Sequence, residues 1–163
     1  LGLSGADANL IQAYKRPITN IDFGLVGDIE VVNAKALNNF LDMGTVPVFC
    51  AITHDQKGQM LNTNADTIAS ELAIALSTKF KVTLYYCFEK QGVLYDKDDD
   101  KSVIPNIDWP LYQELISKNV ISDGMLPKME NSFRALKSKV KRVCIGNTAM
   151  LQSAPGLYTT LTL

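Results

Sequence analysis

Residues 60–66 read MLNTNAD, and this stretch marks the point where an apolar segment gives way to a helix-like pattern. Asn64 can cap the first turn of that helix, because its amide oxygen can accept a hydrogen bond from a backbone N–H group of the turn. The remaining N–H groups and the positive end of the helix dipole would face outward, an arrangement that holds anions. Asn62 offers a side-chain donor toward the same space. Asp66 is the odd member, because a carboxylate facing an anion site needs a cation nearby.

A second junction between a loop and an expected helix occurs at residues 123–128, which read DGMLPK and place Lys128 in the first helical turn. Lys128 is the candidate cation for Asp66. Open α/β sheets bind their ligands at the carboxyl ends of parallel strands. We therefore expect Asp66 and Lys128 to lie close together at that edge, with a phosphate and a second anion held between the two junctions.

Strands and helices alternate along the rest of the chain. Strands are expected at Leu1–Ser4 (short and buried), Val46–Ile52, Val82–Cys87, Arg142–Gly146 and Leu157–Leu163, and helices from Asn33 to Gly44 and at Ala65–Leu76, Trp109–Lys118 and Leu126–Lys137. The continuous apolar run Val46–Ile52 is typical of a strand covered on both faces. The alternation predicts an α/β protein, a three-layer α/β/α sandwich with a mostly parallel sheet. A break near Thr78–Lys81 would separate one lobe, residues 1–78, from another, residues 79–163.

Two hairpins are also expected. The first would pair Phe23–Val26 with Ile29–Val32 around a turn at Gly27-Asp28. The second would start at Gly92–Tyr95 and have the charged segment Asp96–Lys101 as its tip. A calcium site is conceivable in this tip, but the spacing does not match an EF-hand loop. A solvated turn is therefore the favoured interpretation.

Length and composition argue against several classes of protein. A chain of 163 residues suffices for one domain or two small lobes, and its net charge of −1 gives no sign of nucleic-acid or membrane partners. No apolar run approaches the roughly 20 residues that span a bilayer. Cys50, Cys87 and Cys144 each lie inside an apolar run, which predicts reduced core residues of a cytoplasmic protein. His54 is the only histidine, so no metal site is expected.

Several stretches resemble the acetylglutamate kinases of the amino acid kinase superfamily. They are the pentad 62–66, the segment Gly124-Met125-x-Pro127-Lys128, the opening Leu1–Gly5, Gly24–Gly27 followed by Ile29–Asn33, and Val46–Val48. The resemblance implies an amino acid kinase-like fold and an N-terminal part with a lysine, a glycine-rich phosphate loop and a substrate-binding arginine. None of these is found here, and neither Gly-x-x-x-x-Gly-Lys-Ser/Thr nor Gly-x-Gly-x-x-Gly occurs in the chain. We therefore expect the chain to be the C-terminal part of such a kinase.

The activity that the resemblance implies is transfer of the γ-phosphoryl group of ATP to the side-chain carboxylate of an N-acyl-L-glutamate, a step of arginine biosynthesis. A glutamate-type carboxyl has a pKa of about 4.3 and is ionised at neutral pH, so no general base is required. The obstacle is to bring two anions together, which lysines, helix N-termini and Mg²⁺ overcome. The implied cofactors are ATP and Mg²⁺, the metal held mainly by the nucleotide, and the intact protein is expected to be a homo-oligomer.

The resemblance also implies roles for single residues. Lys128 matches the lysine that contacts the transferring phosphoryl group, and an ordinary surface lysine is the alternative. Asp66 matches the aspartate that positions the catalytic lysines, although the helix dipole alone would also favour an acid there. Asn62 matches the amide that binds the amino-acid substrate. Asn64 is a weaker substrate-binding candidate, since capping the helix would explain it equally.

For ATP, the resemblance points to the loop that follows the strand Val82–Cys87 and to a stretch before Gly124. The candidate nucleotide-binding residues are Glu89, Gly92, Val93, Leu94, Val120, Ile121 and Ser122. Related kinases carry Thr/Ser-Asp-Val-x-Gly in the loop, so Glu89 and Lys90 depart from the pattern. Gly92 would allow a close backbone approach.

Two other functions stay open. The chain could be a non-catalytic nucleotide-binding or subunit-association module, an interpretation favoured by the missing glycine-rich loop. A dinucleotide-dependent oxidoreductase on a similar sheet lacks its glycine fingerprint. The acyl group, acetyl or a larger one such as succinyl, cannot be identified from these residues.

Overall fold

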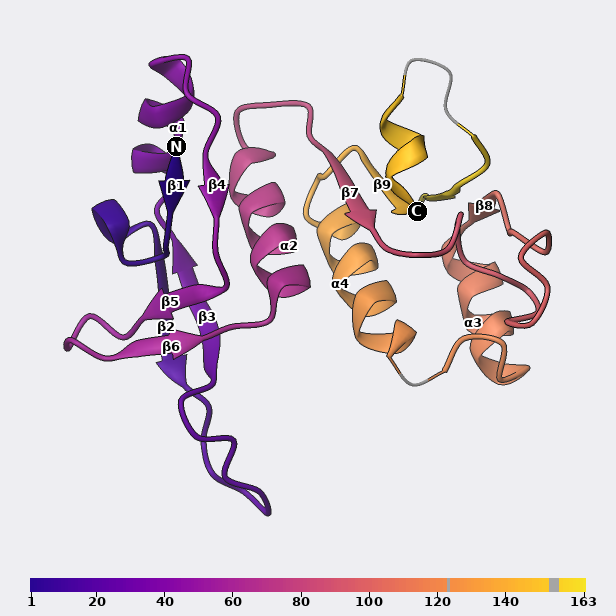
Figure 1. Ribbon diagram of the computed structural model, residues 1–163, viewed down its shortest axis with the longest axis horizontal. Coiled ribbons are helices and arrows are strands. Elements are labelled where there is room, and N and C mark those ends of the chain that lie inside the picture. Colours follow the sequence, from indigo (N-terminus) through magenta and orange to yellow (C-terminus); the bar gives the residue numbers. More distant parts are fainter. Residues whose placement is uncertain (123, 153–155) are drawn as a thin grey trace. The chain divides into compact units, whose positions relative to one another are not determined.

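The computed structural model describes residues 1–122, 124–152 and 156–163, so Asp123 of the second junction lies outside the described residues. The chain divides into two compact units, Leu1–Leu76 and Ser77–Leu163, each with its own strands and helices (Figure 1). The predicted α/β class is confirmed. Four of the described strand pairings are parallel and three are antiparallel, so the sheets are mixed.

Unit 1 contains a four-stranded sheet, a separate pair of short strands and two helices. In chain order its elements are β1 (Gly2–Leu3), a short 3₁₀ helix (Asp7–Asn9), β2 (Ile11–Lys15), β3 (Gly27–Val32), α1 (Ala34–Asp42), β4 (Val48–Phe49), β5 (Ile52–His54), β6 (Met60–Asn62) and α2 (Ala65–Leu76). The sheet has the order β3-β2-β5-β6, and β1 pairs with β4 in parallel. Asn33 caps α1 by accepting a hydrogen bond from the Ala36 N–H group, and Gly44 follows the helix with a positive φ of 73°.

The core of unit 1 lies between this sheet and its two helices. Leu10, Ile11, Leu37 and Ile68 form the buried cluster. Residues from β3, α1 and α2 pack against this cluster, because the apolar residues of each helix recur at intervals of three and four positions and so share one face. This packing fixes the position of α2 on the sheet, and with it the junction at residues 62–66.

The first predicted hairpin is wrong, because the strand that pairs with Ile29–Val32 is β2 and not Phe23–Val26. Gly27 and Asp28 lie inside β3, which pairs in antiparallel fashion with β2, so the turn lies within residues 16–26. A Cβ on Gly27 would lie 2.8 Å from Leu61 Cβ and 3.0 Å from Thr63 Oγ1. Gly27 is therefore required for close packing, and it does not form a turn.

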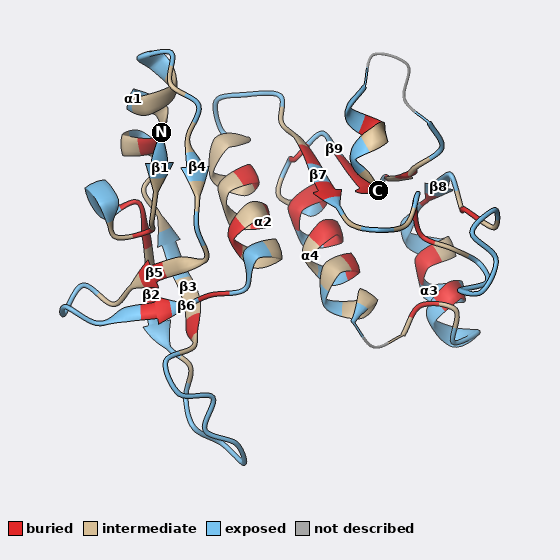
Figure 2. Ribbon diagram, viewed as in Figure 1, coloured by how far each residue is buried: buried red, intermediate tan, exposed pale blue. Residues whose placement is uncertain are grey.

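Unit 2 contains a four-stranded sheet in the order β7-β9-β10-β8. Its elements are β7 (Thr83–Cys87), β8 (Asn106–Ile107), α3 (Trp109–Ser117), α4 (Met125–Lys137), β9 (Arg142–Gly146), a short 3₁₀ helix (Thr148–Leu151) and β10 (Thr159–Leu161). Strand β9 pairs in parallel with β7 and in antiparallel fashion with β10. Figure 2 shows buried residues concentrated on β9 and along α4.

An aromatic cluster joins α3 to α4. The Tyr112 ring stacks on Phe133 with a centroid distance of 4.8 Å, and Trp109 meets the edge of Phe133 at 5.1 Å. The ammonium of Lys137 lies 3.9 Å from the centroid of the Trp109 ring, within the range of a cation–π contact. The cluster gives unit 2 a packed face that links the two helices.

Other expectations about burial were wrong. Leu1 is 55% exposed and the first strand is not buried. The run Val46–Ile52 is divided between β4 and the start of β5, and Val46 and Val48 are 75% and 62% exposed. Cys144 is buried, and burial raises the pKa of its thiol, whereas Cys50 and Cys87 are exposed. None of the helices within the described residues is long and apolar enough to cross a membrane.

Candidate active site

The junction between β6 and α2 places its side chains alternately, as extended chain does. Asn62 and Asn64 are exposed, and Thr63 between them is 2% exposed. The backbone N–H of Asn62 donates to the carbonyl of Leu25 at 2.8 Å, which ties the junction to the end of the loop at residues 16–26. Two asparagine side chains therefore reach solvent from a segment whose middle residue is anchored.

A pair of buried threonine hydroxyls provides that anchor. The Thr63 hydroxyl donates to the Gly27 carbonyl at 3.0 Å. The oxygens Thr53 Oγ1 and Thr63 Oγ1 lie 2.8 Å apart, so the Thr53 hydroxyl can donate to Thr63. Buried hydroxyls with partners of this kind hold strands in a defined register. The network thus joins β3, β5 and β6 directly beneath the junction.

The predicted cap of α2 is observed. Asn64 Oδ1 accepts a hydrogen bond from the Thr67 N–H group at 3.0 Å, the geometry of an N-cap residue with the third residue of its helix. Asp66 is in the first turn of α2. Asn62, Asn64 and Asp66 thus lie together at one helix N-terminus in unit 1, where the dipole favours anions.

Lys128 lies in unit 2, in the first turn of α4. Its ammonium is 4.7 Å from the centroid of the Tyr86 ring, which is buried in β7. The contact directs the lysine side chain across the start of α4 toward β7, and Gly124 leaves the helix without a side-chain cap. Asp66 and Lys128 belong to different units, and their meeting in one site stays a prediction.

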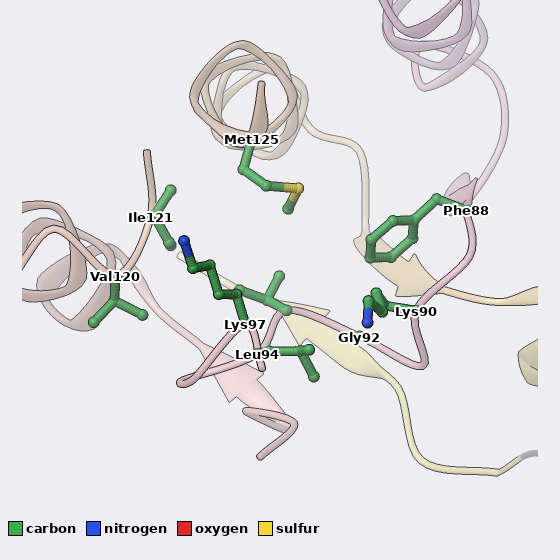
Figure 3. A pocket seen from close by; sticks show the side chains of 9 residues that line it. Phe88, Lys90, Gly92, Leu94, Lys97, Val120, Ile121 and Met125 are labelled. Carbon is green, nitrogen blue, oxygen red and sulfur yellow. The ribbon is translucent and has the colours of Figure 1, made fainter. Parts of the chain in front are cut away.

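A cavity of about 160 Å³ opens in unit 2 between the loop after β7 and the segment before α4 (Figure 3). Its lining residues are Phe88, Lys90, Gly92, Val93, Leu94, Lys97, Val120, Ile121 and Met125. The volume is below the roughly 300–1,000 Å³ of whole-ligand pockets, so it suits one apolar part of a larger ligand. Most of the described lining residues are apolar, and the charged groups among them are the ammonium groups of Lys90 and Lys97.

The cavity brings together five of the seven residues expected to bind a nucleotide, from segments far apart in sequence. These are Gly92, Val93, Leu94, Val120 and Ile121, whereas Glu89 and Ser122 are not among the lining residues. Sequence reasoning did not propose Phe88, Lys90, Lys97 or Met125 as nucleotide-binding residues. Lys97 lies in the tip that was interpreted as a solvated turn, and an exposed charged turn carries no signal of which side chain faces inward.

Gly92 has a packing role inside unit 2. A Cβ there would lie 2.7 Å from Thr159 Oγ1 and 2.7 Å from Val103 Cγ1. The buried Thr159 hydroxyl accepts from the Val93 N–H group at 2.8 Å and donates to the Ile104 carbonyl at 2.7 Å. The close backbone approach expected of Gly92 is thus made to Thr159 of β10.

The second predicted hairpin is observed. Leu94 and Val103 form an antiparallel bridge, and the Tyr95 N–H group donates to the Ser102 carbonyl at 2.8 Å. In the tip, Asp96 and Asp99 accept backbone N–H groups. Across residues 1–122, 124–152 and 156–163, no group of three or more His, Cys, Asp or Glu side chains is placed to hold a metal ion. The tip residues 96–101 are exposed, and the backbone hydrogen bonds to Asp96 and Asp99 are consistent with a solvated turn.

Relatives with similar sequences are acetylglutamate kinases. The chain is 54% identical over 145 residues to "Acetylglutamate kinase" of Bacteroides fragilis, which covers 89% of this chain and 56% of the relative. It is 48% identical over 156 residues to "Acetylglutamate kinase" of Parabacteroides distasonis, covering 96% of this chain and 61% of the relative. The chain therefore spans less than two thirds of the length of these relatives.

Solved structures with the same fold include two kinds of protein. The smu.665 protein of Streptococcus mutans UA159 is 27% identical, with a TM-score of 0.79 over 99% of this chain and 60% of its own. A carbamate kinase of Giardia lamblia bound to AMP-PNP is 11% identical, with a TM-score of 0.68 over 99% of this chain and 61% of its own, and shows the fold alone. The amino acid kinase family matches residues 1–147. Together with the α/β fold and the predicted junctions, this match shows that the chain belongs to the amino acid kinase family.

Proposed function

We propose that this chain is part of an acetylglutamate kinase, in which unit 1 binds the N-acyl-L-glutamate and unit 2 binds ATP. The observation that carries the proposal is the identity of 48–54% to relatives of that name, over 89–96% of the chain. The apolar cavity of unit 2 supports it, because five residues expected to bind the nucleotide line one cavity. Its size and apolar walls suit a flat base.

In this proposal the N-terminus of α2 receives the acylamino acid. Asn62 donates a hydrogen bond to the substrate, and Asn64 holds the first turn so that backbone N–H groups face the ligand. The buried threonine pair keeps this junction in place. Asp66 orients cations that approach the same space. The substrate carboxylate is already ionised, so these groups bind and orient it and no proton need be removed.

Lys128 supplies the charge for the transferring group. A lysine in the first turn of α4 adds an ammonium to the N–H groups of a helix N-terminus, and both favour negative charge. Mg²⁺ would be held mainly by the nucleotide, because Mg²⁺ in such sites binds the substrate phosphates with one or two carboxylates at most. When bound, it neutralises charge on the phosphate oxygens. Action as a cytoplasmic homo-oligomer belongs to the same proposal.

The test uses a full-length chimera that joins the N-terminal segment of the Bacteroides fragilis relative to this chain. We expect ADP release that depends on N-acetyl-L-glutamate or N-succinyl-L-glutamate, and no turnover by the 163-residue chain alone, which has no glycine-rich phosphate loop. Nucleotide binding by the chimera without phosphoryl transfer would contradict the proposal and favour a non-catalytic module. Robust turnover by the chain alone would refute the account of the missing groups.

Single substitutions in the chimera then test the roles. Lys128→Ala should lower kcat by about 10²-fold or more, the scale for loss of one preorganised transition-state donor. Lys141→Ala removes the same charge from an exposed position in unit 2 and serves as the control. Asn62→Ala should act mainly on the KM for the acylamino acid. A kcat for Lys128→Ala equal to that of the control would remove Lys128 from the site.

A further inference from the structure

Among the described residues, the charged side chains that line the cavity of unit 2 are those of two lysines, Lys90 and Lys97. Between them lie mainly apolar side chains. An apolar floor with ammonium groups at its edge fits a ligand that has a flat apolar part and an anionic part. The two lysines differ, however, in what their ammonium groups already bind.

Lys90 is engaged within the protein. Its Nζ atom lies 2.6 Å from Asp100 Oδ1, and this hydrogen bond raises the pKa of Lys90. The pair connects the loop after β7 to the tip of the hairpin. Lys90 would have to give up this partner to bind an anionic ligand.

Lys97 has no ion-pair partner among the described residues. It occupies the tip Asp96–Lys101, whose shape is set by hydrogen bonds that do not involve its side chain. The Ser102 hydroxyl lies 2.9 Å from the Asp96 carbonyl and 2.7 Å from the Asp99 carbonyl. Figure 3 shows the Lys97 side chain extending toward Ile121, with Phe88 and Lys90 on the other side of the cavity. The hairpin therefore presents an available cation to the cavity.

The other charges of the tip make this cation important. The segment 96–101 carries four aspartates and two lysines, so without Lys97 the tip would hold four carboxylates and a single ammonium, that of Lys101. Asp100 is held by Lys90, and Asp96 and Asp99 accept backbone N–H groups. An anionic ligand would thus be repelled by the tip unless Lys97 met it.

We propose that Lys97 is an anchoring residue of the nucleotide site, and that its ammonium contacts a phosphate group of the bound nucleotide. The inference rests on the proposed function, because it takes the cavity to hold the base. It adds a residue from the hairpin tip to those that the family resemblance implies. The Lys90–Asp100 pair links the loop after β7 to the tip that carries Lys97.

The test compares adenosine, AMP and ADP as probes, titrated into the 163-residue chain in a calorimeter. Lys97→Met removes the charge and retains an apolar stem of similar length. We expect the affinity for ADP to fall about tenfold or more, the scale for one charge-assisted hydrogen bond, and the affinity for adenosine to change less than about twofold. Lys97→Arg should retain most of the affinity for ADP.

Lys101→Met is the matched control, since it removes the same charge from the same tip but does not line the cavity. Circular dichroism verifies the fold of each variant. Salt gives a second readout: in Lys97→Met, added salt should screen the aspartates and strengthen ADP binding, relative to its effect on the original chain.

The outcomes separate the two proposals. Selective loss of the phosphate-bearing probes in Lys97→Met alone supports the role of Lys97. Equal loss of adenosine and ADP, or an equal loss of ADP affinity in Lys101→Met, overturns it while nucleotide binding stands. If no probe binds the original chain up to roughly millimolar concentration, the nucleotide site of unit 2 and the role of Lys97 both fail.

Discussion

Gly27 shows that the structural role of a single residue is not always evident from the sequence. A Gly-Asp pair between apolar segments is a common turn signal, yet Gly27 lies within β3. Its missing side chain makes room for Leu61, Thr53 and Thr63. Sequence alone does not distinguish a glycine needed for its backbone angles from one needed for close packing, because the residue type is the same in both cases.

We expect Gly27→Ala to lower the free energy of unfolding by about 1–3 kcal/mol, the usual cost of overpacking a closed site. The added Cβ would lie 2.8 Å from Leu61 Cβ and 3.1 Å from Thr53 Oγ1, and moving the threonine would disturb its bond to Thr63. Urea unfolding followed by circular dichroism measures the change.

Gly2→Ala is the control for this substitution, because Gly2 is also in a strand of unit 1 and a Cβ there has no neighbour within 4 Å. Its effect should stay within about 0.5 kcal/mol. Equal unfolding midpoints for the two variants would contradict the packing role of Gly27.

At the scale of elements, the bounds of one amphipathic helix and one buried strand were predictable, and the division of the apolar run at residues 46–52 was not. Ala65–Leu76 and Arg142–Gly146 have the bounds that their patterns predicted. The run 46–52 failed, because periodicity does not reveal which neighbours cover a strand, and β4 pairs with β1 over two residues. Long-range pairing of this kind leaves no local signal.

The cap of α2 gives a prediction at this scale. Asn64→Ala should destabilise unit 1 by about 1 kcal/mol, because the Thr67 N–H group loses its acceptor at the N-terminus of the helix. Asn64→Asp should retain the stability, since a carboxylate accepts the same bond and suits the dipole. Thermal unfolding measures both variants.

Asn20→Ala, in an exposed loop of the same unit, provides the reference for this pair. An Asn64→Ala variant as stable as Asn20→Ala would show that the observed bond contributes nothing. In that case Asn64 would have to be explained by ligand binding alone.

For the whole molecule, the residues of the candidate site that match the family pattern were predictable from the sequence, and the others were not. The nucleotide residues at 92–94 and 120–121 line one cavity although some 26 positions separate them, and the family pattern indicated both stretches. Lys97 was missed, because it comes from a tip whose charges indicate solvent exposure. The direction of a long side chain depends on how the hairpin packs, and composition does not encode that.

The division into units gives a prediction for the molecule. Residues 77–163 should fold alone, because this segment is longer than the roughly 60 residues at which single domains already fold. Its strand β9 is also buried among elements of the same unit. Amide signals in a two-dimensional NMR spectrum should be dispersed and coincide largely with those of the whole chain.

Ile145→Asp places a charge at a fully buried position of β9 and should abolish that dispersion. A collapsed spectrum for the unaltered segment 77–163 would show that unit 2 depends on unit 1 for its fold.

The aromatic cluster between α3 and α4 has an optical consequence. Trp109 is the single tryptophan of the chain, and its partly exposed ring contacts the ammonium of Lys137 and the ring of Phe133. Excitation at the long-wavelength edge of the absorption spectrum, where tryptophan alone absorbs, therefore gives fluorescence from unit 2 and none from unit 1. A shift of the emission reports an event that reaches α3 or α4, and melting of β1 to α2 could proceed unseen. Trp109 is thus an intrinsic fluorophore that distinguishes unit 2 from unit 1 without a label.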